Sequence, residues 1–500
     1  MTSSLFRGRP RHATGHIGVR VGHAALGGAA GVVWLVLPVM TSTTQDPVPA
    51  ARGGTVVTAE AAEAAEADGA SATDYVLPLV AVAAAGALGG YGYVRRIRRS
   101  RSRTTPGLVS PAPPAPSPVD VERQARASLV LADDCIRTSR EALGYVTAAE
   151  PVLRALRAAE TELSAAFAIW RRYEEGTPED PAGRRQALVG VVGRCAEAGR
   201  QLDGEAEGFD AEWGAGDALA VAEGRFRELA GRTGGVERAL AEAERRYGAS
   251  AVASVVGYVE QAKDRLVFAT SRLNRARQDD DSGDADGFRR GLRAAEGAVA
   301  QAGVLLGGVT RLTEELRTAA GLLPAALTGA EAELAAVRAT GFPPRLAHAD
   351  GVLAAVRDEL TGGPYDPLDA LRRVVRAVEG TGGGRSGVIA AGAELVARST
   401  TGSADDFVGT HRAAVGTEAR ALLAAARGAG AADADRLARK ARELAERDVR
   451  AHGNPFAGEG AAAHGSGVAG AVLGGVQLGE EAGGGPVVAF GGPDTRERWG

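Results

Sequence analysis

Between residues 120 and 452, apolar residues recur every three or four positions, with charged residues between them. The segment VVGYVEQAKDRLVFATSRLNRA shows the pattern well, because its apolar side chains fall on one stripe of a helix with 3.6 residues per turn. That stripe consists of Val255, Val259, Ala262, Leu266, Ala269 and Leu273. No segment has the strict alternation of apolar and polar residues that is typical of a half-buried strand. The pattern therefore predicts an all-α body of about ten helices.

Glycine, proline and polar clusters divide this region. They predict helix ends at residues 176–178, 279–287, 323–324, 342–344, 362–364 and 381–384. Short connections make neighbouring helices antiparallel, so we expect elongated, coiled-coil-like antiparallel helical bundles. Several glycines fall inside the predicted helices, where each costs about 0.5–1 kcal/mol relative to alanine. Because they follow no obvious pattern, we interpret Gly190, Gly193, Gly224, Gly257, Gly297, Gly303, Gly307 and Gly308 as drift.

The strongest apolar signal lies before the helical body. Residues 75–94 form an uncharged run of 20 residues, which is long enough to cross the roughly 30 Å hydrocarbon core of a membrane. Six arginines follow it directly: Arg95, Arg96, Arg98, Arg99, Arg101 and Arg103. Arginine-rich flanks are typical of the cytoplasmic side, so we predict a single-pass protein of the cell membrane with its helical region and C-terminus in the cytoplasm. The same arginines are the candidate contacts to lipid headgroups.

The N-terminal residues 1–50 resemble a secretory signal. Four early arginines precede the uncharged stretch 24–39, and Val48-Pro49-Ala50 offers a small-residue cleavage pattern. An uncleaved signal anchor is the alternative. Both interpretations leave the helical region in the cytoplasm.

Three further segments have the composition of linkers or tails. Residues 51–74 are of low complexity and are predicted to form an extracytoplasmic linker. Residues 95–119 combine the arginines with six prolines and are predicted to be a semi-rigid juxtamembrane linker. Residues 453–500 are rich in glycine, so we expect a disordered tail.

Charge and cysteine content narrow the function further. The chain carries a net charge of −4 although residues 95–103 hold six arginines, so the helical body is mildly acidic. Nucleic-acid binding needs a basic face, and we therefore expect no nucleic acid as partner. Cys135 and Cys195 follow the membrane span, and no CxxC or Cys/His spacing accompanies them. We expect two free, half-buried thiols rather than a disulfide or a metal site.

Two motifs resemble ligand-binding loops without the required context. GSGVAG at 465–470 matches G-x-G-x-x-G but has no preceding strand, so it does not predict a nucleotide site. DDDSGDADG at 279–287 resembles a calcium loop, yet Ser282 and Arg293 would stand where the loop needs acids. We interpret it as a solvated turn in which Asp284 or Asp286 caps the next helix.

The segment ADDFVGTHR places acids near a histidine in a way that could serve acid–base chemistry. Asp405 and Asp406 lie within two helical turns of His411. No nucleophile or second motif accompanies them, so we expect a helix cap and a surface histidine. We predict that the chain is not an enzyme, needs no cofactor and has neither catalytic nor metal-binding residues.

Several stretches resemble actinobacterial TPM-domain membrane proteins. They are SATDYVLPLVAVAAAGALGGYGYVRRIRRSRSRTTP, DDCIRTSREALGY, VEQAKDRL, GPYDPLDALRRV, ADDFVGTHRAAVGTEARALLA and GAVLGGVQLG, in this order between residues 71 and 479. The resemblance implies a signal peptide, an extracytoplasmic TPM domain linked to phosphatase activity, one membrane helix, a cytoplasmic helical region and a Gly-rich tail.

One departure from that family decides the functional interpretation. The TPM domain should lie between signal and membrane helix, where this chain has only residues 41–74, so the domain is missing and no phosphatase residue is carried over. The missing domain, the helix glycines and the altered tail fit a copy under relaxed selection. We predict a single-span, membrane-anchored helical scaffold that self-associates or binds a protein partner through its helical region. The alternative is a phosphatase-like TPM-family enzyme or its regulatory subunit.

Overall fold

The computed structural model divides the chain into two units, Met1–Ser110 and Pro111–Gly500. The structure describes residues 117–147, 149–215, 217–339, 343–379, 387–452, 472–473, 476–477 and 489–499. All of these belong to the second unit. The predicted signal, the span 75–94 and the arginines that follow it therefore lie outside the described residues.

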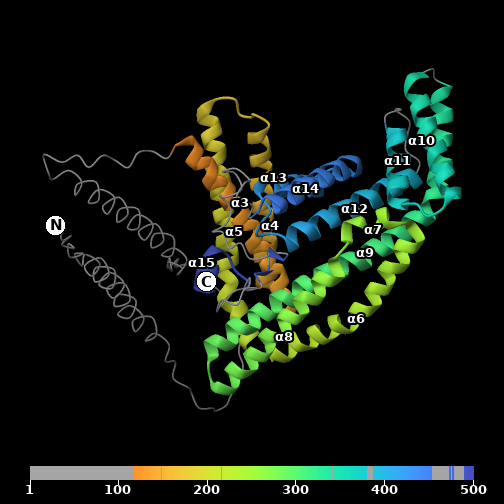
Figure 1. Ribbon diagram of the computed structural model, residues 1–500. Coiled ribbons are helices and arrows are strands. Elements are labelled where there is room, and N and C mark those ends of the chain that lie inside the picture. Colours follow the sequence, from red (N-terminus) through yellow and green to blue (C-terminus); the bar gives the residue numbers. More distant parts are fainter. Residues whose placement is uncertain are drawn as a thin grey trace, which may run out of the picture. The chain divides into compact units, whose positions relative to one another are not determined.

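The described residues confirm the all-α fold (Figure 1). The longer helices are α3 (Pro118–Ala142), α4 (Glu150–Glu174), α5 (Pro181–Ala215), α6 (Ala218–Tyr247), α8 (Tyr258–Ser282), α9 (Ala285–Arg338), α10 (Pro343–Gly362), α11 (Pro367–Glu379), α12 (Gly387–Thr410), α13 (Thr417–Gly428) and α14 (Ala431–Ala451). The short elements are η1 (Leu143–Tyr145), α7 (Ala249–Val252), η2 (Ala253–Val255) and α15 (Pro493–Trp499). Two antiparallel strands of two residues each, β1 (Val472–Leu473) and β2 (Val476–Gln477), pair Leu473 with Val476.

Helix α9 is the central element of this unit. It runs for 54 residues and packs against α6, α8, α10, α11 and α12. The helix end predicted at 323–324 is wrong, because α9 continues through Pro324. Proline removes one backbone hydrogen bond, but the flanking Leu323, Ala326 and Leu327 are buried and hold the helix together on both sides. Among the described helices, α9 alone is long and apolar enough to cross a membrane, a property it shares with the core helices of many bundles.

Other predicted helix ends are confirmed. The segment 176–178 separates α4 from α5, and 362–364 separates α10 from α11. At 279–287, α8 ends at Ser282 and is followed by Gly283, whose φ of +77° suits glycine. The solvated turn is therefore shorter than predicted, because residues 279–282 belong to α8 and Asp279 is buried. Asp284 then caps α9 by accepting a hydrogen bond from the Gly287 amide, as predicted. The tight turn makes α8 and α9 an antiparallel pair that packs along its length.

The apolar stripes meet in three cores among the described residues. The first joins α6–α12 and includes Leu305, Leu316 and Val374. The second joins α3, α4 and α5 to parts of α6, α8 and α9. The third lies between the end of α12, α13 and α14. Because α9 contributes to the first two cores, it connects them mechanically.

The glycines inside helices differ in the space that a side chain would have. A Cβ atom at Gly308 would lie 2.6 Å from Oδ2 of Asp406, whereas one at Gly307 would meet nothing within 4 Å. Gly308 therefore lets α9 approach α12 closely, and its interpretation as drift is wrong. Gly193 and Gly224 also face open space, so for them the structure offers no packing reason.

The end of the chain departs from the expected disordered tail. Residues 489–499 include α15, and Phe490 is fully buried in the second core. This segment contacts α3 and α5, which precede it by roughly 300 residues in the chain.

Candidate functional site

The predicted site residues Arg95, Arg96, Arg98, Arg99, Arg101 and Arg103 lie outside the described residues. Within the described part, both cysteines are free, but they are buried rather than half-buried. Burial raises the pKa of Cys135 to about 11 and that of Cys195 to about 12. Both therefore remain protonated at neutral pH, and neither is placed to act as a nucleophile.

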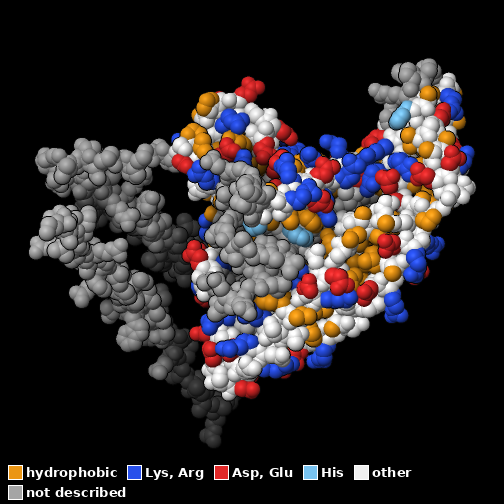
Figure 2. Space-filling view, viewed as in Figure 1, with side chains coloured by type: hydrophobic (Ala, Val, Ile, Leu, Met, Phe, Trp, Pro, Cys, Tyr) orange, Lys and Arg blue, Asp and Glu red, His pale blue; other side chains and the backbone are white. Residues whose placement is uncertain are grey.

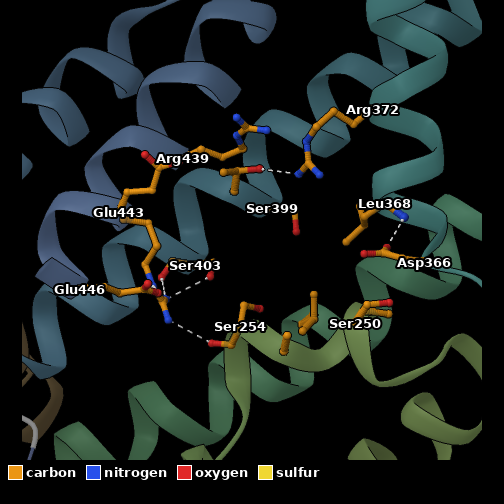
Figure 3. Close-up of a pocket in the computed structure, with 15 residues that line it drawn as sticks. Ser250, Ser254, Asp366, Leu368, Arg372, Ser399, Ser403, Arg439, Glu443 and Glu446 are labelled. Atoms are coloured by element: carbon orange, nitrogen blue, oxygen red, sulfur yellow. Dashed lines mark hydrogen bonds and ion pairs between the residues drawn. The ribbon is translucent and has the colours of Figure 1, made fainter. Parts of the chain in front are cut away.

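A polar pocket of about 370 Å³ opens where α7, η2, α9, α11, α12 and α14 meet (Figure 3). Its walls carry hydroxyl groups and charged side chains on a partly apolar floor. The polar lining residues are Ser250, Ser254, Asp366, Arg372, Ser399, Thr400, Ser403, Arg439, Arg442, Glu443 and Glu446. The pocket thus gathers residues that are almost 200 positions apart, because the α9 bundle brings α7 beside α12 and α14.

Helix α12 supplies three hydroxyl groups to the pocket from one of its faces. Ser399, Thr400 and Ser403 of α12 share a face because residues three and four apart are neighbours on a helix. Thr400 Oγ1 lies 2.7 Å from Oδ1 of Asp435 on α14 and so ties the two helices together. These hydroxyls can donate or accept hydrogen bonds without changing charge.

Arg442 of α14 is the most strongly held group of the pocket. Its Nε donates to Glu446 over 2.7 Å, and its Nη1 donates to the Ser403 carbonyl over 3.1 Å. Its Nη2 donates to the Ser254 carbonyl over 3.4 Å, and the guanidinium lies 3.9 Å from the centre of the Phe407 ring. Since α14, α12 and η2 all meet at this side chain, Arg442 fixes the shape of the pocket.

Arg372 and Asp366 form the opposite wall. Arg372 Nε lies 3.1 Å from Oδ1 of Asp435, and Arg376 reaches the other oxygen over 2.8 Å. Asp366 caps α11 by accepting from the amides of Leu368 and Asp369. Burial raises the pKa of Asp366 above its ordinary value.

Arg439 differs from the other charged groups of the pocket. It is exposed at the rim, and it forms no hydrogen bond or ion pair with any residue that the structure describes. By contrast, Glu446 is paired with Arg442, and Glu443 lies 3.6 Å from Lys440. Arg439 therefore leaves a guanidinium available to an acceptor from outside.

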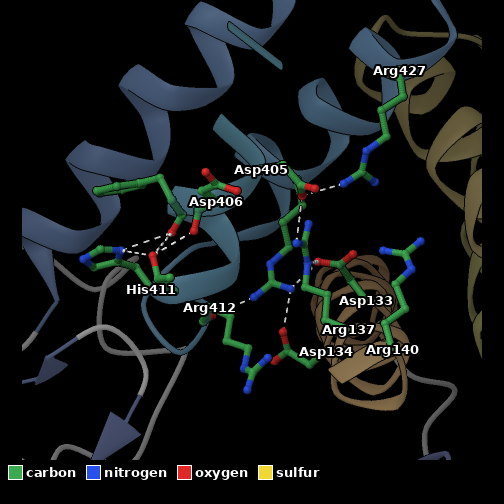
Figure 4. A network of polar contacts seen from close by, with 12 residues as sticks. Asp133, Asp134, Arg137, Arg140, Asp405, Asp406, His411, Arg412 and Arg427 are labelled. Carbon is green, nitrogen blue, oxygen red and sulfur yellow. Dashed lines mark hydrogen bonds and ion pairs between the residues drawn. The ribbon is translucent and has the colours of Figure 1, made fainter. Parts of the chain in front are cut away.

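A second polar cluster, the buried ion network, connects α3 to α12 and α13 (Figure 4). Arg137 donates to Asp133 over 2.9 Å and to Asp405 over 2.8 Å. Arg420 bonds Asp133 and, over 2.7 Å, Asp134. Burial alone would raise the pKa of Asp133, but Arg137 and Arg420 hold it well below its ordinary value. The network thus keeps Asp133 ionised and its buried arginines paired.

The structure does not assemble the acid–base group suggested by ADDFVGTHR. Asp405 binds Arg137 and Arg427, and Asp406 binds Arg311. His411 Nδ1 instead lies 3.1 Å from the Phe407 carbonyl, and its ring stacks on Phe407 with centroids 4.2 Å apart. The expected helix cap and surface histidine are both wrong, because both acids lie inside α12 and His411 is buried.

The sequence reasoning missed the polar pocket. A usable signal was present in α14, where Arg439, Arg442, Glu443 and Glu446 follow helical spacing on one face. Ser254 and Arg372 carry no comparable signal, since only tertiary packing brings them there. Among the described residues, no group of three or more His, Cys, Asp or Glu is arranged to hold a metal ion.

Comparison with known proteins gives a distant relationship. The chain is 29% identical over 420 residues to two curated proteins of Mycobacterium tuberculosis, UPF0603 protein MT2410 (strain CDC 1551 / Oshkosh) and UPF0603 protein Rv2345 (strain ATCC 25618 / H37Rv). The similarity covers 74% of this chain and 63% of each relative, so the chain spans less than two thirds of their length. No family model matches the chain. No solved structure matches it either.

Proposed function

We propose that this protein is a membrane-anchored helical scaffold whose polar pocket binds a segment of a protein partner. The observation that carries the proposal is the pocket itself, in which Glu443 and Glu446 are already paired while Arg439 at the rim has no partner among the described residues. Such a guanidinium beside hydroxyl groups suits a carboxylate-bearing peptide segment.

The rigidity of the frame supports a binding role. Arg442 and Asp435 each join two or more helices at the pocket, so the site exists before a partner arrives. A preformed site loses little conformational entropy on binding.

In this proposal the membrane location comes from residues 75–94 and the arginines that follow. The uncharged run crosses the membrane once, and Arg95–Arg103 keep the helical unit on the cytoplasmic side next to anionic headgroups. On the face shown in Figure 2, positive and negative side chains are interspersed over the described helices. That distribution supports a protein partner or a second copy rather than nucleic acid.

We also propose that the chain is related to TPM-domain membrane proteins but lacks the TPM domain. The support is the resemblance of several ordered stretches between residues 71 and 479, together with the short interval 41–74. Similarity to longer relatives that covers 63% of their length is compatible with this relationship.

Site-specific photo-crosslinking in membranes tests the scaffold. A photoreactive residue replaces Ser250, which is exposed at the pocket rim, and the matched control replaces Gln186, which is exposed on α5. We expect a discrete adduct from position 250 and none from position 186. In the background of Arg439→Glu, the adduct should fall at least about tenfold, since a reversed charge repels an acidic partner.

Two outcomes would contradict this proposal. One is equal adduct formation at positions 250 and 186. The other is an adduct at position 250 that Arg439→Glu leaves unchanged, because the guanidinium would then play no part in binding.

A further inference from the structure

The last described segment, residues 489–499, occupies a site on α3 and α5. Phe490 is fully buried, and its ring stacks on Phe209 of α5 with centroids 5.1 Å apart. In Figure 1 the C-terminus and α15 lie beside α5. The chain therefore returns from its far end to the first helices of the unit.

Asp203 of α5 recognises the backbone of this segment. Its Oδ1 accepts hydrogen bonds from the amides of Gly492 over 2.8 Å and Thr495 over 3.0 Å. The same oxygen accepts from Thr495 Oγ1 over 2.6 Å. Asp203 thus acts as the N-cap of α15 although it belongs to another helix. A helix of seven residues is unstable alone, so α15 depends on this contact.

The segment fits because two of its residues lack a side chain. Gly491 has a φ of +151°, and a Cβ there would lie 2.4 Å from the Thr495 side chain. A Cβ at Gly492 would lie 2.3 Å from the carbonyl oxygen of Gly199 on α5. Ser139 of α3, which is itself buried, accepts from the Gly491 amide over 3.1 Å.

The surface of α5 that binds this segment also needs a residue without a side chain. A Cβ at Gly199 would lie 2.7 Å from Cδ of Pro493, so α5 must have glycine where the proline packs. Residues of α3 and α5 thus contact the aromatic, glycine, proline and threonine positions of the segment: Phe209 contacts the ring, Ser139 and Asp203 the backbone amides, Gly199 the proline and Asp203 the threonine. The surface formed by Ser139, Gly199, Asp203 and Phe209 is called the tail site below.

We propose that the tail site is a recognition site for the sequence Phe-Gly-Gly-Pro-x-Thr, and that residues 489–499 are its detachable, tethered ligand. The Gly-rich sequence between 453 and 488 links the ligand to α14. The contacts come from backbone amides and from the side chains of Phe490, Pro493 and Thr495, all within one short segment, so a free peptide of the same sequence makes the same contacts. This inference does not depend on the proposed scaffold function.

Peptide binding to the full-length chain in detergent tests the proposal. The probe is a fluorescently labelled peptide of residues 486–500, followed by fluorescence anisotropy. In the variant Phe490→Ala the tethered segment loses its buried ring, so the site is open and the peptide binds. A flexible tether gives its ligand a high effective concentration at the site, so the wild-type chain should bind the peptide at least about tenfold more weakly.

Two matched variants keep the test independent of folding. A chain with Gly492→Val opens the site without removing the aromatic ring and should bind the peptide like Phe490→Ala. A chain with both Phe490→Ala and Gly199→Val should lose peptide binding while its circular dichroism stays helical. A peptide with Gly492→Val should not bind to any of the chains.

The proposal is overturned if neither opened chain binds the peptide. It is also overturned if Gly199→Val or the Gly492→Val peptide leaves the affinity unchanged, because binding would then be unspecific. If the wild-type chain is a dimer that Phe490→Ala converts to a monomer, the ligand reaches the site of a second copy, and the recognition itself is supported.

Discussion

Arg420 shows how single residues hold this protein together. Its side chain is 1% exposed and bonds two acids of α3 and two backbone carbonyls of its own region. A buried guanidinium is costly to desolvate, and complete pairing offsets that cost. The network's contribution to stability is therefore seen mainly when one member is removed, because the remaining buried charges then lack a partner.

We predict that Arg420→Met lowers the free energy of unfolding by about 3 kcal/mol, because Asp133 and two carbonyls lose a buried donor. Urea unfolding of the full chain in detergent, followed by circular dichroism, measures the change. The control is Arg436→Met, whose exposed pair with Asp433 is worth less than about 1 kcal/mol. Equal effects of the two substitutions would show that the network is not stabilising.

His411 makes stability depend on pH. Burial lowers its pKa to about 4 from the ordinary 6.5. Between these values the unfolded chain binds a proton that the folded chain does not, so stability falls as pH decreases from 6.5 to 4. We predict that His411 contributes a loss of about 2 kcal/mol between pH 7 and pH 5.

The substitution His411→Gln should remove this part of the pH dependence, since glutamine does not titrate. Urea unfolding at pH 7 and pH 5 provides the comparison between variant and wild type. His348 lies on α10, and His348→Gln serves as control. If His411→Gln and wild type lose the same stability over this range, His411 is not the titrating group.

At the scale of elements, helix α9 decides the arrangement of the others. Its approach to α12 depends on Gly308, where the carboxylate of Asp406 occupies the space of a Cβ while it pairs with Arg311. The neighbouring Gly307 has free space and only the ordinary helix cost of glycine. The two adjacent glycines therefore differ: the packing excludes a side chain at Gly308 but not at Gly307.

We predict that substitutions at two adjacent glycines change the free energy of unfolding in opposite directions. Gly307→Ala should raise the free energy of unfolding by about 0.5–1 kcal/mol, because alanine restricts the unfolded chain and favours the helix. Gly308→Ala should lower it by about 1–3 kcal/mol, since the added methyl displaces Asp406 from Arg311. Thermal unfolding of both variants gives the signs, and a stabilising Gly308→Ala would contradict the close approach.

Much of the helical pattern could be predicted from the sequence, because apolar stripes and turn residues are local signals. The stripe from Val255 to Leu273 and the cap at Asp284 are examples. Pro324 misled the prediction, since buried neighbours outweighed a local helix breaker. The polar pocket and the docking of Phe490 could not be foreseen, because they depend on which distant helices pack together.

At the scale of the whole molecule, the proposed function needs a helical unit and a membrane anchor. Among the described helices, α9 contributes to the first two cores and α12 to the first and third, so the three cores are connected. In the proposed function, a partner bound at the polar pocket is held at a fixed place relative to these cores. Above all, we propose that residues 75–94 hold this unit on the cytoplasmic side of the membrane.

A topology map tests that claim most directly. One reporter that is active only outside the cytoplasm is inserted after residue 60 with the rest of the chain retained, and the same reporter is fused after residue 452 at the end of α14 in a second chain. We predict activity for the insertion at 60, none for the fusion at 452, and recovery of both in the membrane fraction, because both chains keep residues 75–94. Activity of both reporters, of neither, or recovery of either chain in the soluble fraction would contradict the claim.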